Sequence, residues 1–313
     1  MQRPNLPVMV DSVLTDSPST ISSPSNASSR RGVPKELLVF DPILLNANSP
    51  SRKERISAVK EDRGIMKVVT FLDKLMYNLW LFLPGCPPLP GDIDYSALRA
   101  TALWYSHIYI ATHSIAKVDY RGLALGSAFL AYKSSEYSPG RLKMSNALEA
   151  LQRTLEPGNQ LAQHHLERVG VMACSIEERL MWLTGFEFDL MLPFRYLDSI
   201  FHSLKSTIPA DTFSILRKLA MNFLDDSFLG RSSLFFSGDV LAFAAVTMAA
   251  ADLQLALPNL ESSNQDNMYK LPDVCAEMRK TYKRPDLEIS HEMYSMPPAR
   301  CTRRQTQLLR VTL

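Results

Sequence analysis

GLALGSAFLAYKSSEY (residues 122–137) is the stretch that decides the fold. Its apolar part, residues 123–132, leaves a helix with no side that suits water, so such a helix must be buried. A membrane span needs about 20 apolar residues, and shorter runs are typical of core helices. Small residues such as Gly126 and Ala128 let neighbouring helices approach closely. We therefore predict that this stretch is the central helix of a helical bundle and that it ends near Lys133.

The composition is that of a globular chain with nearly balanced charge. Of the 313 residues 46% are hydrophobic, so a large core and about two domains are expected. The formal net charge of +2 gives no electrostatic argument for binding to nucleic acid or to an anionic membrane. No apolar run is long enough to span a membrane, and no membrane partner is expected. The cysteines, at positions 86, 174, 275 and 301, lack zinc-ribbon spacing and suit a reducing compartment.

Both ends of the chain differ in composition from the middle. Residues 1–50 are rich in Ser, Pro and Asn and are predicted to be disordered, because they cannot bury enough apolar surface to fold. Their Ser-Pro pairs at Ser17, Ser23 and Ser49 are candidate sites for proline-directed kinases, or ordinary linker residues. Residues 286–313 are predicted to form a basic tail, solvated or used in nuclear import or partner binding.

The region between the tails has helical periodicity throughout, and the predicted fold class is all-α. Ser175 and Glu178 have the spacing of a capping box at the start of the fifth helix. The alternating segment 185–190 is short and has no evident partner strand, so it is predicted to be a connector. The Ala-rich segment 238–255 repeats the character of the opening stretch, which favours two bundles in tandem. The predicted helices cover residues 65–83, 95–111, 123–132, 141–155, 175–185, 194–204, 214–228 and 238–255.

Four segments, in this order, resemble the cyclin box family. FLAYKSSE (129–136) is similar to the family's Leu-Ala-Ser-Lys-x-Glu-Glu segment. EERLMWLTGFEFDLMLPFRYL (177–197) is similar to the segment that reads Glu-x-x-Leu-Leu-x-x-Leu-Gly-Phe before a proline. AMNFLDDSFL (220–229) and SGDVLAFAAVTMAAADLQLALP (237–258) resemble the second box of transcription-type cyclins, closest to the L and K types. In addition to these four, SPSRKERI (49–56), which precedes them in the chain, resembles the lead-in found in that group.

The resemblance implies two tandem cyclin boxes. A kinase-binding box is expected at residues 51–205 and a cyclin-like box at residues 206–285. The chain departs from the pattern where Ser135 and Glu136 replace the paired glutamates. It also lacks the peptide-docking patch of cell-cycle cyclins in its first helix, and the Arg/Ser tail common in L-type cyclins.

The resemblance also implies a site. In cyclins a lysine and a glutamate, here Lys133 and Glu177, lie together and hydrogen-bond the backbone at the start of the kinase's mobile C helix. Lysine offers three donors and a carboxylate offers acceptors, so the pair can bind both polarities of a peptide backbone. Without the resemblance, the simplest interpretation of Lys133 is a solvated lysine at a helix end. Glu177 would then be a carboxylate in the first turn of a helix that interacts favourably with the helix dipole. The other expected kinase-binding residues, some of which must belong to the core, are Glu136, Leu130, Met144, Leu148, Leu180 and Phe186.

No catalytic constellation is found in the sequence. There is no Gly-rich phosphate loop, and His164 and His165 lack metal-ligand spacing, so no metal, no cofactor and no enzymatic activity are expected. The predicted function is the activating subunit of a cyclin-dependent kinase, nuclear and acting in transcription or RNA processing. RNA polymerase II and splicing-associated proteins are candidate further partners. Two alternatives remain: a nucleic-acid-binding double cyclin fold of the transcription factor IIB type, and a helical scaffold without a kinase.

Overall fold

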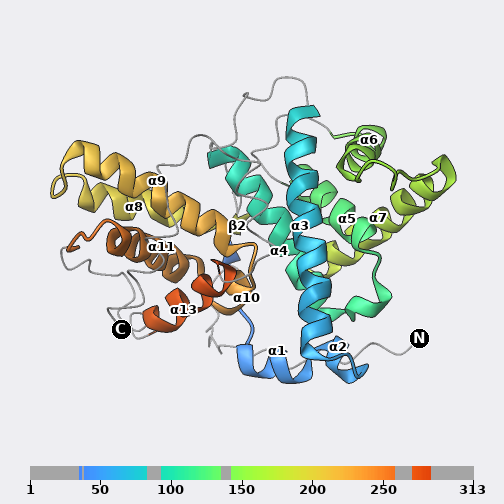
Figure 1. The fold of residues 1–313 in the computed structure, drawn as a ribbon, viewed down its shortest axis with the longest axis horizontal. Coiled ribbons are helices and arrows are strands. Elements are labelled where there is room, and N and C mark those ends of the chain that lie inside the picture. Colours follow the sequence, from blue (N-terminus) through green and yellow to red (C-terminus); the bar gives the residue numbers. More distant parts are fainter. Residues whose placement is uncertain (1–34, 37–38, 83–92, 135–141, 258–269, 283–313) are drawn as a thin grey trace, which may run out of the picture. The chain divides into compact units, whose positions relative to one another are not determined.

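The computed structural model describes residues 35–36, 39–82, 93–134, 142–257 and 270–282, and its fold is all-α, as the sequence predicts (Figure 1). Two short strands, β1 (Lys35–Glu36) and β2 (Leu190–Met191), pair in parallel. The helical elements are α1 (Pro42–Asn48), α2 (Pro50–Lys53), α3 (Ala58–Phe82), α4 (Ile93–Thr112), the 3-10 helix η1 (Ile115–Lys117), α5 (Tyr120–Ser134), α6 (Met144–Thr154), α7 (Gln163–Leu183), α8 (Phe194–Leu204), α9 (Ala210–Ser227), α10 (Ser232–Phe235), α11 (Gly238–Asp252) and α13 (Leu271–Tyr282).

Helix α5 is the centre of the first group of helices. It packs against α3, α4, α6 and α7, and every residue from Gly122 to Tyr132 is buried. Its contact with α7 is so close that a Cβ on Gly126 would lie 2.8 Å from the carbonyl oxygen of Ala173. The small residues of this stretch are therefore required by the distance between two helix backbones, which confirms the prediction of a central buried helix.

Helix α11 has the same place in a second group. It packs against α8, α9 and α13, and its apolar residues are buried on nearly every side. The predicted boundary between the two cyclin boxes, between residues 205 and 206, stays a prediction. Helix α8, which this boundary assigns to the first box, packs on α9 and α11.

A buried polar cluster joins α3 and α4 to α9. The Nε of Arg99 donates to Asp73 Oδ1 at 2.5 Å, and its Nη1 donates to the backbone oxygen of Asp225 at 3.1 Å. The hydroxyl of Ser96 donates to Asp225 Oδ2 at 2.8 Å. Because buried charges are costly unless they are paired, these bonds favour a single arrangement of the three helices. We call these four residues the Arg99 cluster.

The N-terminal prediction is wrong for part of residues 1–50. Asp41 caps α1, since its Oδ1 accepts hydrogen bonds from the backbone nitrogens of Ile43 and Leu44 at 2.7 and 3.0 Å, and Pro42 suits the first helical position. Strand β1 also lies in this part of the chain. The predicted disordered residues 1–34 and the predicted basic tail 286–313 lie outside the described residues.

The predicted start of the fifth helix is also wrong. Helix α7 begins at Gln163, and the hydroxyl of Ser175, in mid-helix, donates to the backbone oxygen of Val171 at 3.2 Å instead of capping an end. Val169 and Ala173 are buried, so tertiary packing holds this part of the chain helical. The predicted connector 185–190 ends in β2, whose partner strand lies more than 150 residues away in sequence.

Substitution of two glycines tests how closely α5 and α7 pack. Gly126→Ala is expected to lower the free energy of unfolding by about 1–2 kcal/mol, because the new Cβ overlaps a backbone oxygen that cannot move alone. Gly170→Ala, on α7, is expected to raise it by about 0.5 kcal/mol, because its Cβ meets Leu148 at an ordinary 3.5 Å and alanine favours the helix. Urea unfolding measures both, and equal effects would contradict this packing.

A second prediction concerns pH. Burial raises the pKa of the Asp225 carboxyl to about 6, against the opposing effects of Arg99 and Ser96. An unfolded aspartate titrates near 3.9, so between about pH 4 and pH 6 the folded state binds more protons and stability falls as pH rises. Asp225→Asn removes this decline. Its unfolding free energy relative to the parent should therefore rise by about 1–2 kcal/mol between pH 4.5 and pH 7.5.

The matched control is Asp198→Asn, whose side chain is 72% exposed. The difference in unfolding free energy between Asp198→Asn and the parent, measured by urea unfolding, should not change with pH. If the unfolding free energy of Asp225→Asn relative to the parent is also constant with pH, then Asp225 is ionised in both the folded and the unfolded state across this range.

Candidate functional site

Lys133 and Glu177 meet where α5 ends beside the middle of α7. The ammonium of Lys133 donates to both carboxylate oxygens of Glu177, at 2.8 and 3.1 Å, and lies 4.2 Å from the centre of the Phe129 ring. The Lys133 side chain is 49% exposed and that of Glu177 is 9% exposed. The structure therefore brings together the two residues that the sequence resemblance pairs, and it leaves the lysine end of the pair open to solvent.

Apolar side chains continue from this pair along α7. Met181 follows Glu177 by four residues, so it lies on the same helix face, and it is partly exposed. Helix α7 then stops in a left-handed turn, with Gly185 at φ 63° and Phe186 at φ 59°. The backbone nitrogen of Phe186 donates to the Met181 oxygen at 2.9 Å, which closes the turn. Phe186 is an aromatic residue in a backbone region that disfavours bulky side chains, and its ring is held at the surface.

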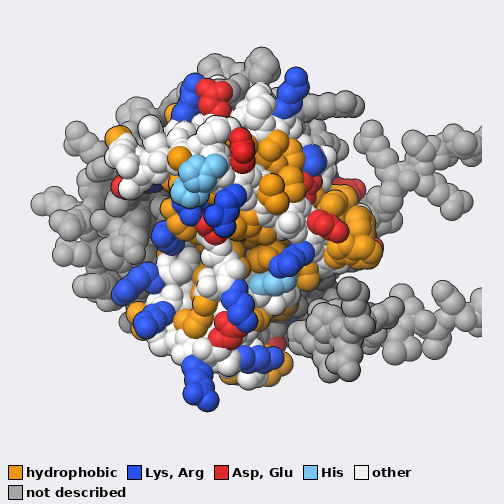
Figure 2. All heavy atoms as spheres, turned by 90° about the vertical axis from the view of Figure 1, so that its right-hand side faces the viewer, with side chains coloured by type: hydrophobic (Ala, Val, Ile, Leu, Met, Phe, Trp, Pro, Cys, Tyr) orange, Lys and Arg blue, Asp and Glu red, His pale blue; other side chains and the backbone are white. Residues whose placement is uncertain are grey.

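Trp182 and Phe186 add an exposed aromatic pair at the end of α7. The Trp182 side chain is 69% exposed and that of Phe186 is 49% exposed, and the two rings meet edge to face with centroids 5.0 Å apart. Figure 2 shows the side of the molecule that carries α6 and α7, where hydrophobic patches lie among basic side chains. We call Lys133, Glu177, Met181, Trp182 and Phe186 the docking strip.

The remaining predicted residues have different surroundings. Leu130 is 2% exposed and Leu180 is fully buried, so in this structure both belong to the core. Met144 and Leu148 are partly buried on α6, and Glu136 lies outside the described residues. Sequence reasoning missed Met181 and Trp182. The four-residue spacing from Glu177 was a signal for Met181, whereas nothing in the sequence distinguishes Trp182 from a core residue.

Other kinds of site are not found in the described part of the chain. No three His, Cys, Asp or Glu side chains gather there as a metal site would require. No helix among the described residues is both long and apolar enough to cross a membrane.

The sequence matches no protein-family model and no curated protein. Several solved structures are similar to this chain in fold. A chain of the yeast RNA Pol II CTD kinase CTDK-1 complex aligns with a TM-score of 0.59 at 15% identity, over 80% of this chain and 74% of that one. A chain of the Chaetomium thermophilum CAK complex bound to ATP-gamma-S aligns at 0.53 and 15% identity, over 88% and 84%. A chain of the yeast TFIIK complex aligns at 0.51 and 12% identity, over 77% and 95%. At these identities the likeness concerns the fold, which is a cyclin fold.

The Lys133–Glu177 pair is expected to matter little for folding. Lys133→Met/Glu177→Gln should lower the free energy of unfolding by about 1 kcal/mol or less, because water screens the lysine end of the pair and the double change leaves no buried carboxylate unpaired. Arg99→Met should cost about 3 kcal/mol, because Arg99 and Asp73 are 7% and 3% exposed and the carboxylate would be left unpaired. Urea unfolding of the two variants measures this difference. Equal losses would mean that the pair serves the fold and is not held available for a partner.

Proposed function

We propose that this chain is the regulatory subunit of a cyclin-dependent protein kinase and that the docking strip binds the kinase. The observation that carries the proposal is the Lys133–Glu177 ion pair, half exposed at one end and followed by exposed aromatic rings, on a cyclin fold. In this proposal the chain does not act as a catalyst itself but selects a conformation of its partner.

The ion pair suits recognition of a peptide backbone. Two hydrogen bonds join Lys133 to Glu177, and the ammonium has a third donor while the carboxylate oxygens keep further acceptor capacity. A backbone segment at the end of a kinase helix presents carbonyl oxygens and amide groups that this pair can satisfy. Because a charged pair buried without partners is costly, only a docking register that satisfies both residues is stable.

The apolar part of the strip supplies the affinity. Aromatic side chains at the centre of an interface contribute most of the binding free energy in many complexes. Trp182 and Phe186 are exposed in the free chain, and covering them removes apolar surface from water. In the free chain the Phe186 ring already packs edge to face on Trp182, so part of its side-chain freedom is lost before docking.

Activation then follows as a population shift. A kinase moves between conformations with its C helix inward or outward, and only the inward one lets the helix glutamate pair with the lysine that positions ATP phosphates. A subunit that binds the inward conformation more tightly raises its population by the ratio of the two affinities.

The proposed setting is transcription or RNA processing in the nucleus. It is supported by the motifs that resemble L- and K-type cyclins and by the similar solved structures, one of which is named as an RNA polymerase II CTD kinase. RNA polymerase II or splicing-associated proteins are proposed as further partners of the assembled kinase.

Affinity purification of the tagged full chain from its own cells tests the proposal. The parent should recover a protein kinase that phosphorylates a polymerase C-terminal repeat peptide. Lys133→Ala/Glu177→Ala and Trp182→Ala/Phe186→Ala should each lower the recovered kinase at least about tenfold, which corresponds to a loss of about 1.4 kcal/mol.

Two control variants match these changes in kind. Glu149→Ala/Arg153→Ala removes an exposed ion pair on α6, and Ile215→Ala removes an apolar side chain, 48% exposed, on α9. Both should recover kinase at the parent level. Recovery with all variants would keep the kinase partner and reject the docking strip. No kinase with any folded variant would reject the proposal in favour of a scaffold, or of a nucleic-acid-binding protein if the chain binds DNA in a salt-dependent way.

A further inference from the structure

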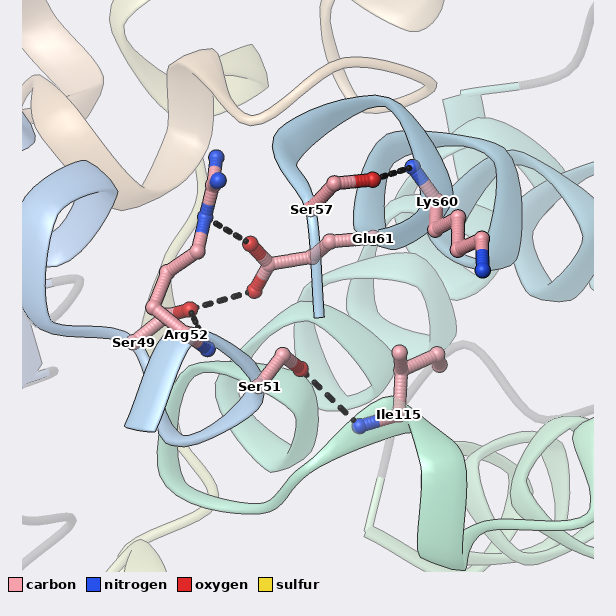
Figure 3. A network of polar contacts seen from close by, with 7 residues as sticks. All are labelled: Ser49, Ser51, Arg52, Ser57, Lys60, Glu61 and Ile115. Atoms are coloured by element: carbon pink, nitrogen blue, oxygen red, sulfur yellow. Dashed lines mark hydrogen bonds and ion pairs between the residues drawn. The ribbon is translucent and has the colours of Figure 1, made fainter. Parts of the chain in front are cut away.

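Ser49 has the sequence of a phosphorylation site and the surroundings of a core residue. Ser49-Pro50-Ser51-Arg52 places a proline directly after the serine and a basic residue two further on, a pattern that proline-directed kinases favour. In the structure Ser49 links α1 to α2 and is only 3% exposed. Its hydroxyl accepts a hydrogen bond from the backbone nitrogen of Arg52 at 3.2 Å and donates one to Glu61 Oε1 at 2.6 Å (Figure 3).

Glu61 attaches the α1–α2 segment (Pro42–Lys53) to the first turn of α3. Glu61 is 4% exposed, and both of its carboxylate oxygens accept hydrogen bonds from the segment: one from Ser49 and one from Arg52 Nε, at 3.0 Å. Figure 3 shows these side chains converging on Glu61. A further bond runs from the backbone nitrogen of Ile115 to the Ser51 hydroxyl at 3.1 Å. Polar contacts therefore carry much of the attachment.

The segment contributes little to the apolar core. Helix α1 has no buried residue, and its Ile43 and Leu44 are 78% and 61% exposed. Phe40 and Leu45 are partly buried against the core. Segments with few buried apolar contacts open at a fraction of the free energy of global unfolding. The α1–α2 segment is thus expected to detach locally while the helices around α5 stay folded.

A phosphate on Ser49 does not fit the attached segment. It carries a charge of about −1.5 to −2 at neutral pH, and it would stand against the Glu61 carboxylate in place of the hydroxyl that now donates to it. The hollow beside Ser49, lined by Glu61, His107 and Arg231 among others, has room for roughly one water molecule, which is too little for a phosphate group. Two arginines are near Ser49: Arg52 already bonds to Glu61, and Arg231 lines the same hollow, but neither enlarges the space that a phosphate would need.

We propose that Ser49 is a phosphorylation site for a proline-directed kinase and that its phosphorylation keeps the α1–α2 segment detached from α3. The Ser49 oxygen attacks the γ-phosphorus of ATP, the bond from that phosphorus to the β–γ bridging oxygen breaks, and ADP leaves. The hydroxyl proton passes to the base of the kinase. The step takes place in the detached state, in which Ser49 is exposed. This inference does not depend on the docking strip.

The test uses the full chain as a substrate. A purified proline-directed kinase already saturated with its own cyclin is supplied with ATP, and phosphate on Ser49 is followed by site-specific mass spectrometry, because the chain has other Ser-Pro pairs at residues 17, 23 and 138. Ser49 in the chain should react at least about tenfold more slowly than in a peptide of residues 44–57, since the detached state is a minor population. Glu61→Gln should raise the rate several-fold, whereas Glu149→Gln, an exposed ion-pair residue on α6, should not.

Hydrogen–deuterium exchange then measures what the phosphate does. In the phosphorylated parent, residues 42–56 should exchange faster, while α5 and α7 should keep their protection; this measurement needs no variant. No phosphate on Ser49 in either the parent or Glu61→Gln, with the peptide phosphorylated, would overturn the proposal. Unchanged or stronger protection of residues 42–56 after phosphorylation would also overturn it, because the phosphate would then be bound within the attached segment.

Discussion

The close approach of α5 to α7 at Gly126 is the constraint on which the rest of the site depends. Because this position has no Cβ, the backbone of α5 lies against the carbonyl oxygen of Ala173, and the helix can be buried on every side. A helix buried in this way reaches solvent only at its ends. Lys133, in the last turn, is thus placed beside Glu177 by the packing of residues one and two turns earlier, and its position is set by the core.

Three groups of polar contacts in this structure differ mainly in how far solvent reaches them, and we infer a different role for each from that difference. In the Arg99 cluster the Arg99–Asp73 ion pair is buried, and its link to Asp225 favours one arrangement of three helices. The bonds around Glu61 are buried but hold a segment with little apolar surface, so they are suited to opening. The Lys133–Glu177 pair keeps one end in water, is expected to contribute little to folding, and retains hydrogen-bonding capacity.

The accuracy of the sequence predictions followed the kind of signal that each used. Helix α8 was predicted at its observed bounds because its apolar periodicity is clear and a proline precedes it. The start of α7 was misplaced because Ser175 and Glu178 satisfy a local capping rule, while burial of Val169 and Ala173 extends the helix by twelve residues. The pairing of β1 with β2 had no usable signal, since two residues are too few for any periodicity.

The sequence by itself determined the all-α class and the buried central helix, and its likeness to cyclins singled out Lys133 and Glu177 as a candidate pair. The likeness implied that these two residues lie together, but their spacing of 44 positions does not show it, and the packing of α5 on α7 closes that distance. Tertiary structure also decided which apolar residues are exposed. Leu180 and Met181 are neighbours of similar hydrophobicity, yet one is buried and the other partly exposed. The physical reason is that successive residues of a helix point about 100° apart, and surrounding helices cover only some of those directions.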